Sequence, residues 1–238
     1  MRVFVTVIIS LLCFSAEART EEYWVTQLRA TPGQFQTLLD TLKTTDWQNS
    51  IGSKPIVMRH SQGDQWDVML LGTIGKSCTN AKCFERQKLF HSLWRTSLNH
   101  LVDFELTFEA TSDTDWATLQ LLNETASLYH IEMFNAAAGK HDALMRQRHM
   151  ENDYLAKTGQ QTNVIFKVTR GSDVDAFTIG FHESLQTFAE SPDLPVEAFE
   201  KAAIAAGFKN RADISFHLRE LIVGHHDTLA TKVATKVE

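Results

Sequence analysis

Two stretches with similar spacing decide the fold: YWVTQLRATPGQFQTLLDTL at residues 23–42 and YHIEMFNAAAGKHDALMRQR at residues 129–148. In each copy a glycine follows the leading tyrosine by ten residues, Gly33 in the first and Gly139 in the second. The residues before the glycine alternate as in a strand, and the apolar residues after it recur at helical spacing. The sequence therefore predicts a strand, a turn and a helix, used twice.

A second pair of similar stretches follows the first at nearly the same distance in both copies. It reads GDQWDVMLL at residues 63–71 and GSDVDAFTI at residues 171–179, and Asp67 in one matches Asp175 in the other. Similar stretches that recur in the same order indicate an internal repeat. We therefore expect two tandem copies of one unit, in which His100 corresponds to His225.

Each copy has the pattern strand, helix, strand, strand, helix, strand. In the first copy the expected elements are residues 23–30, 34–42, 55–60, 65–71, 84–98 and 102–109. In the second they are residues 128–135, 140–155, 163–169, 174–181, 196–223 and 228–237, with the last helix broken near Gly207.

This βαββαβ order predicts a four-stranded antiparallel sheet with both helices on one face. Two such sheets would cover each other's open faces. The predicted fold is therefore α+β, with two tandem ferredoxin-like βαββαβ units packed sheet to sheet as a dimeric α+β barrel. The expected divisions are a signal peptide at 1–18, a first unit at 19–111, a linker at 112–127 with a helical turn around 116–122, and a second unit at 128–238.

In its element order and in the spacings Tyr-x9-Gly and Gly-x3-Asp, the chain from residue 21 to 238 resembles a fused form of the dimeric α+β barrel superfamily. That superfamily includes antibiotic-biosynthesis-type monooxygenases, ethyl-tert-butyl-ether-degradation-type proteins and haem enzymes of the chlorite-dismutase type. The resemblance implies a ligand pocket whose residues are scattered along the chain. It rests on order and spacing and on no diagnostic motif.

The first residues have the layout of a secretory signal peptide. An early charge at Arg2 precedes an apolar run that ends in Ala16-Glu17-Ala18, a small-x-small cleavage pattern. The run is shorter than the roughly 20 residues that a membrane-spanning helix needs. We expect cleavage after Ala18 and a periplasmic or secreted protein with no membrane segment after cleavage.

Composition narrows the class of partner. The chain is 43% hydrophobic and 22% charged, which is typical of a globular protein, and its net charge of −6 argues against a nucleic-acid partner. Beyond the signal peptide the cysteines are Cys78 and Cys83, whose spacing in an oxidising compartment predicts a structural disulfide. A small-molecule ligand is the expected partner, and association into homo-oligomers stays open.

No motif in the sequence names a reaction or a cofactor. The nucleophile elbow, the H-E-x-x-H zinc motif, the phosphate loop and the dinucleotide-binding glycine pattern are all absent. This excludes several large enzyme classes, although it leaves enzymes with scattered pocket residues open. The ligand, the cofactor and any metal are therefore unknown from sequence.

The repeat itself points to one candidate catalytic pair. His130 and Glu132 stand where the first copy has Trp24 and Thr26, and residues two apart on a strand point to the same face. The pair could act as a base with its orienting carboxylate or as two metal ligands. The alternative interpretation is a polar pair at the rim of a sheet or a satisfied salt link.

A second candidate group is Gly224-His225-His226-Asp227, expected near the end of the last helix. His225, His226 and Asp227 could supply two imidazoles and a carboxylate to a ligand site at the barrel mouth. Alternatively Gly224 ends the helix and the histidines interact with the helix dipole.

The other candidate ligand-binding residues are weaker. Arg59 and His60 end a strand beside a predicted hairpin and, as neighbours, point to opposite faces. Trp24 could line an apolar cavity, although it could also be plain core. On the helix of the second copy, Arg146 and Arg148 are expected to face solvent.

Three functions fit these observations. The leading hypothesis is an exported protein or enzyme of the α+β barrel type that binds a small organic ligand, with acid-base or cofactor-independent oxidative chemistry. The second is a haem- or metal-dependent enzyme with a histidine as ligand. The third is a non-catalytic binding module whose barrel interior is filled by side chains.

Overall fold

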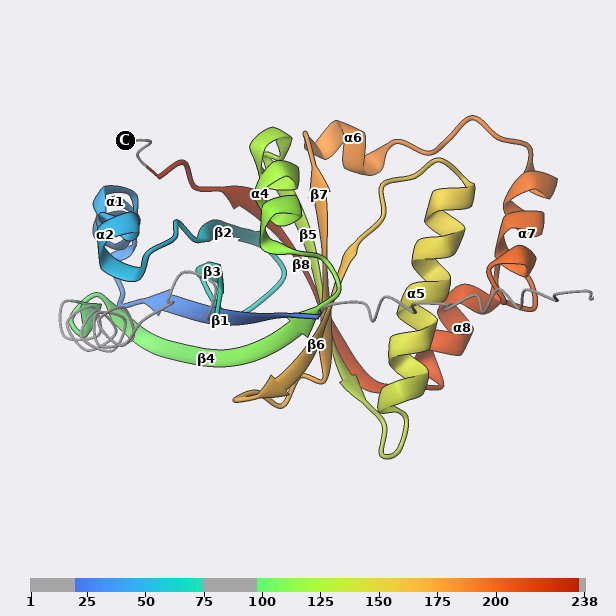
Figure 1. Cartoon of the computed structure of the whole chain (residues 1–238), viewed down its shortest axis with the longest axis horizontal. Helices are drawn as coiled ribbons and strands as arrows, with labels where there is room; N and C mark the ends of the chain where they lie inside the picture. The colour runs from blue at the N-terminus through green and yellow to red at the C-terminus, as the bar shows by residue number, and fades with distance from the viewer. Residues whose placement is uncertain (1–19, 75–97, 236–238) are drawn as a thin grey trace, which may run out of the picture.

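The computed structural model describes residues 20–74 and 98–235, which form a closed eight-stranded antiparallel barrel with helices outside it (Figure 1). The strands are β1 Glu21–Ala30, β2 Ile56–Gln62, β3 Val68–Thr73, β4 Val102–Ser112, β5 Leu128–Ala136, β6 Val164–Arg170, β7 Ala176–His182 and β8 Ile222–Lys232. The helices are α1 Phe35–Thr44, α2 Trp47–Ile51, α4 Trp116–Thr125, α5 His141–Lys157, α6 Leu185–Ala189, α7 Val196–Ala205 and α8 Asp213–Arg219.

The strand order is the same in both halves of the barrel. The first half runs β4-β1-β3-β2 and the second runs β8-β5-β7-β6. The barrel closes where the edge strand β2 pairs with β8 and the edge strand β4 pairs with β6. Closure leaves no strand edge exposed, which removes a common route to aggregation. The expected α+β barrel architecture is therefore confirmed, while the origin of the halves by duplication stays a prediction.

The barrel interior is a packed aromatic and aliphatic core. Tyr23 and Tyr129, which lead the two copies of the repeated stretch, are both completely buried there. Phe166 and Phe177 stack with their ring centroids 4.4 Å apart, and Phe108 meets Phe177 edge-on at 5.9 Å. Such pairs add about 0.5–1.5 kcal/mol each beyond area burial. These side chains make the interior a hydrophobic core.

Helices cover the outside of each half separately. In Figure 1, α1 and α2 lie against the first half, and α5, α7 and α8 lie beside the second. Leu38 and Leu42 of α1 pack on Leu28 of β1, whereas Leu144 of α5 packs on Phe134 of β5. The helical periodicity seen in the sequence therefore serves to cover two sheet faces that point away from the barrel axis.

The Gly-x3-Asp spacing has the same structural cause in both halves. The carboxylate of Asp67 accepts a hydrogen bond of 2.7 Å from the backbone N–H of Ala30, at the end of β1. Asp175 accepts an equivalent bond of 2.7 Å from the N–H of Ala136, at the end of β5. Each aspartate thus satisfies a backbone donor that the strand pairing leaves open.

The glycines of that spacing allow the β2–β3 turn and the β6–β7 turn each to pack against a strand of the other half of the barrel. Gly63 has φ +120°, and a Cβ there would collide with the backbone carbonyl of Asp227 on β8. Gly171 has φ +92°, and a Cβ there would stand 2.9 Å from the carbonyl oxygen of Thr107 on β4. Both positions require a residue without a side chain.

The end of the chain differs from the sequence expectation. The last strand begins at Ile222 instead of Thr228, because β8 pairs with β5 from Ala136 and Ile222 onward. The expected break is confirmed, since Gly207 has φ +104° between α7 and α8. The prediction that Gly224 ends a helix is wrong, because Gly224 lies within β8 and its φ is not positive.

Several expectations fall outside the described residues. These are the signal peptide at 1–18, most of the helix expected at 84–98, and the disulfide between Cys78 and Cys83. Within the described residues, none of the helices combines the length and the apolar character that crossing a membrane requires.

We predict that Gly63→Ala lowers the free energy of unfolding by more than about 3 kcal/mol, because it adds a backbone clash to an unfavourable φ. The control is Gly33→Ala, since Gly33 also has positive φ, +84°, but a Cβ there meets nothing within 4 Å. Gly33→Ala should cost only about 1–2 kcal/mol. Equal losses for both variants in denaturant unfolding would show that the contact with β8 is not tight.

Candidate functional site

The predicted pair of His130 and Glu132 lies on the outer face of β5. Alternation along the strand puts Tyr129 and Ile131 into the barrel core, so that His130 and Glu132 point outward to the side that α5 covers. Their side chains are 22% and 13% exposed, respectively. The expectation that the two share a face is confirmed.

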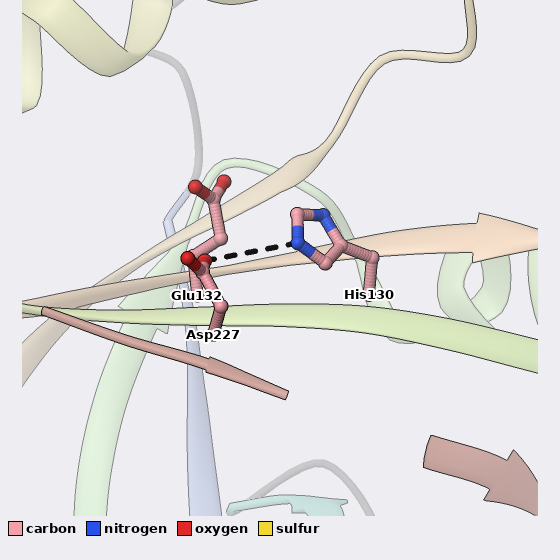
Figure 2. Close-up of side chains that lie close together, drawn as sticks. All are labelled: His130, Glu132 and Asp227. Atoms are coloured by element: carbon pink, nitrogen blue, oxygen red, sulfur yellow. Dashed lines mark ion pairs between the residues drawn. The ribbon is translucent and has the colours of Figure 1, made fainter. Parts of the chain in front are cut away.

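Asp227 of β8 completes a cluster with this pair. It lies directly opposite Glu132 in the register of β5 and β8. Figure 2 shows the three side chains on the same side of the two strands, with a dashed line from His130 to Asp227. The distance from His130 Nε2 to Asp227 Oδ1 is 3.8 Å, and one ligand atom from each residue lies within 4.8 Å of the others.

His225 contacts the other carboxylate oxygen of Asp227, Oδ2. Its Nε2 lies 3.2 Å from Asp227 Oδ2, and its ring stacks on Phe134 with centroids 6.0 Å apart. The two residues share a face because they are two apart on β8. The sequence hypothesis that His225 and Asp227 act together is therefore consistent with the geometry, although they lie on a strand and not at a helix end.

Arg148 of α5 lies behind Glu132 and is 2% exposed. Its Nη1 is 3.5 Å from Glu132 Oε2, and its Nη2 donates to Glu151 Oε2 at 2.5 Å. Its guanidinium also lies over the ring of Phe134, 4.5 Å from the centroid. The expectation that Arg148 faces solvent is wrong, because a cation this deeply buried is kept there by paired carboxylates.

Two further titratable groups near the cluster have shifted pKa values. Burial raises the pKa of Glu151, and the nearby carboxylate of Glu132 raises it further, while Arg148 opposes both. Burial and the nearby His130 lower the pKa of His182, at the end of β7. Burial therefore opposes the charged form of both groups, and Arg148 is the partner that favours the charged form of Glu151.

His130, Glu132, Glu151 and His182 line a cleft of about 410 Å³ between α5, the outer face of β5 and β7, and the segment around α6. His182 meets Phe188 edge-on at 5.1 Å, and His130 lies 5.0 Å from the same ring. The lining residues are His130, Glu132, Glu151, Leu155, Gly159, Gln160, Gln161, Asn163, His182, Thr187, Phe188, Glu190, Ser191 and Pro192.

At the positions that correspond to His130, Glu132 and Asp227 the first half carries no charged side chain. Strand register matches Glu132 with Thr26 and Asp227 with Thr107, and these two threonine hydroxyls lie 3.0 Å apart. Trp24 occupies the position of His130 and packs over Gly72, where a Cβ would collide with its indole. The same register gives Glu105 the position that corresponds to His225, so the expected match of His225 with His100 is wrong.

The remaining predicted ligand residues lie away from the cleft. His60 accepts a hydrogen bond of 3.1 Å at Nε2 from the backbone of Asp64, whose carboxylate lies 4.0 Å from His226 Nδ1. Arg59 is exposed, with its guanidinium 5.8 Å from the ring centroid of Phe35. Trp24 packs against the core under α1. The structure thus brings together His130, Glu132, His225 and Asp227 and leaves Trp24, Arg59, His60 and His226 elsewhere.

Sequence reasoning missed Arg148, Glu151, His182 and Phe188. A usable signal was present for two of them, because Arg148 and Glu151 are three apart on a helix and so share a face. For His182 and Phe188 the sequence gives no comparable signal, since their approach to β5 depends on how β7 and α6 lie in the fold.

We predict that Arg148→Met lowers the free energy of unfolding by about 3–5 kcal/mol, because it leaves Glu132 and Glu151 as buried carboxylates without their cation. The matched control is Arg146→Met on the exposed face of the same helix, which should change it by less than about 0.5 kcal/mol. Chemical denaturation measures both. If the two variants lose the same stability, Arg148 does not stabilise the carboxylates.

No family model matches the chain, and no curated protein matches its sequence. Solved structures do match its fold. An anthrone oxidase-like protein superposes with TM-score 0.55 at 10% identity, over 90% of this chain and 91% of its own. A proposed monooxygenase from Lactobacillus acidophilus superposes with TM-score 0.51 at 4% identity, over 92% and 99%.

A proposed DyP-type peroxidase from Shewanella oneidensis superposes with TM-score 0.50 at 10% identity, over 90% of this chain and 93% of its own. At such identities the likeness is one of fold alone. The chain has the architecture of the dimeric α+β barrel proteins.

Proposed function

We propose that this protein is an enzyme that oxidises a small organic molecule in the cleft beside α5, with His130, Glu132 and Asp227 at its reactive centre. One observation carries the proposal. The two halves have the same strand register, yet the positions of Trp24, Thr26 and Thr107 in the first half are taken by His130, Glu132 and Asp227 in the second, and His130 and Glu132 line a cleft.

The arrangement is poor for stability, which argues for a functional cause. Glu132 and Asp227 lie directly opposite each other on neighbouring strands, where like charges are destabilising. Arg148 adds the desolvation cost of a buried cation. At the corresponding positions the first half has two uncharged side chains that hydrogen-bond to each other, Thr26 and Thr107. Departures from local stability of this kind are typical of functional sites.

The cleft suits a ligand with both apolar and polar parts. Phe188 and Leu155 supply apolar wall, while Gln160 and Asn163 supply amide groups. Small-molecule sites commonly fall in the volume range of this cleft and combine an aromatic contact with a few polar groups. The barrel interior is the less suitable place, because side chains pack it.

The names of the similar structures support oxidation as the reaction class. They are an anthrone oxidase-like protein, a proposed monooxygenase and a proposed peroxidase. Fold alone does not assign a reaction. Together with the charged cleft, these names favour oxidation of an electron-rich aromatic substrate with dioxygen as the oxidant.

The wall of the cleft suits haem poorly. Haem presents two broad apolar faces and carries acidic propionates, so its site needs extended apolar walls and neutral or basic partners. In the described part of the wall the large apolar side chains are Leu155, Phe188 and Pro192, and three glutamates line the same space. We therefore propose no step that involves haem.

The test is dioxygen consumption by the purified full chain with anthrone as the probe substrate. We expect uptake that saturates with anthrone, and Phe188→Ala should raise KM about tenfold, because loss of an aromatic contact costs about 1.4 kcal/mol. Phe216→Ala removes an aromatic ring that is 63% exposed on α8 and should leave KM unchanged.

Two results would count against the proposal. One is the absence of dioxygen uptake with anthrone and simpler phenols. The other is uptake whose KM responds equally to Phe188→Ala and Phe216→Ala, which would place the reaction outside the cleft.

A further inference from the structure

We propose that His130, Glu132 and Asp227 bind one divalent transition-metal ion at the wall of the cleft. The inference deepens the proposed function, because it concerns the same reactive centre and names the ion that the centre holds. The binding itself is a property of the three side chains and can be measured without any substrate.

The spacing of the three groups fits an ion better than direct hydrogen bonds. His130 Nε2 and Asp227 Oδ1 are 3.8 Å apart, which is too long for a hydrogen bond. Metal–ligand bonds of about 2.1 Å place two ligand atoms of one ion roughly 3–4 Å apart. The ligand atoms of all three residues lie within 4.8 Å of one another, so small side-chain rotations bring them to that distance.

Outer contacts orient both carboxylates and leave one oxygen of each for the ion. Thr178 donates to Glu132 Oε2 at 3.1 Å, and Arg148 Nη1 lies 3.5 Å from the same oxygen. His225 lies 3.2 Å from Asp227 Oδ2, while Oδ1 faces His130. Metal sites commonly have such outer partners, which fix the orientation of the ligands.

The ligands are also held on rigid backbone. His130 and Glu132 lie two apart on β5, and Asp227 lies on the directly paired strand β8. Sites built on paired strands are more precise than sites built on loops. In addition, Gly63 packs against the backbone of Asp227 and limits its movement.

Charge at the cluster favours a cation. Glu132 and Asp227 lie directly opposite each other, and the cation that Glu132 contacts, Arg148, is shared with Glu151. A divalent ion between Glu132 and Asp227 would offset the remaining negative charge and relieve their cross-strand repulsion.

The donor set indicates the class of ion. One imidazole and two carboxylates suit Mn²⁺, Fe²⁺ or Zn²⁺, since imidazole favours the transition metals and carboxylates favour hard cations. Three protein ligands leave coordination positions open, as in catalytic metal sites. The ion would supply a Lewis acid at the cleft wall beside Phe188 and Glu151.

The experiment is calorimetric titration of the full chain, freed of metal with a chelator, with Mn²⁺ and separately with Co²⁺. We expect one ion per chain for the wild type. His130→Ala and Asp227→Asn should each weaken binding at least about tenfold, and His225→Ala should weaken it about 10–100-fold through the orientation of Asp227.

His226→Ala is the matched control, because His226 neighbours Asp227 on β8 but lies by Asp64. It should keep the wild-type affinity. Glu132→Gln keeps the size of the side chain and provides a second test if His130→Ala fails to fold. The visible spectrum of bound Co²⁺ should change in His130→Ala, since a nitrogen ligand is lost.

The inference is overturned if the wild type binds no ion, or if His130→Ala, Glu132→Gln and Asp227→Asn all bind as tightly as His226→Ala. Its failure is distinct from that of the proposed function. Metal binding without oxidation of any substrate would support the metal site and contradict the proposed reaction, whereas oxidation by a protein that binds no ion would support the reaction and contradict the metal site.

Discussion

The antiparallel pairing of β8 with β5 is the contact on which both the barrel and the site depend. β8 lies between β5 and the first-half strand β2, so it joins the two halves of the closed sheet. The same pairing sets the register that places Asp227 opposite Glu132. A shift of one residue would turn Asp227 to the other face of the sheet, because side chains alternate along a strand.

A buried ion-pair network around Arg148 joins α5 to the sheet in the second half. Arg148 can remain 2% exposed because Glu132 and Glu151 pair with it and the ring of Phe134 lies under its guanidinium. Removing either side of such a network leaves an unpaired charge in a low-dielectric setting, which is costly. The network thus fixes α5 against the sheet and keeps one wall of the cleft in place.

Packing explains why the inside of the barrel forms the core and the outside carries the candidate site. The inward residues of both halves form one aromatic core, which leaves the outward face of each half to its helices. In the first half that face is apolar beneath α1, with Trp24 filling the space over Gly72. In the second half the corresponding positions carry His130 and Glu132, and a cleft opens beside them.

The sequence by itself determined the element order, the two tyrosine-led stretches, and the pair His130 and Glu132, because period-two and helical patterns are local properties of the chain. Local pattern could not determine the place of Asp227, since residues 132 and 227 meet only through strand pairing. It also misassigned Arg148, because a lone arginine on a helix becomes buried only when distant carboxylates pair with it. Tertiary structure alone decided these contacts, since each depends on register and burial between segments far apart in the chain.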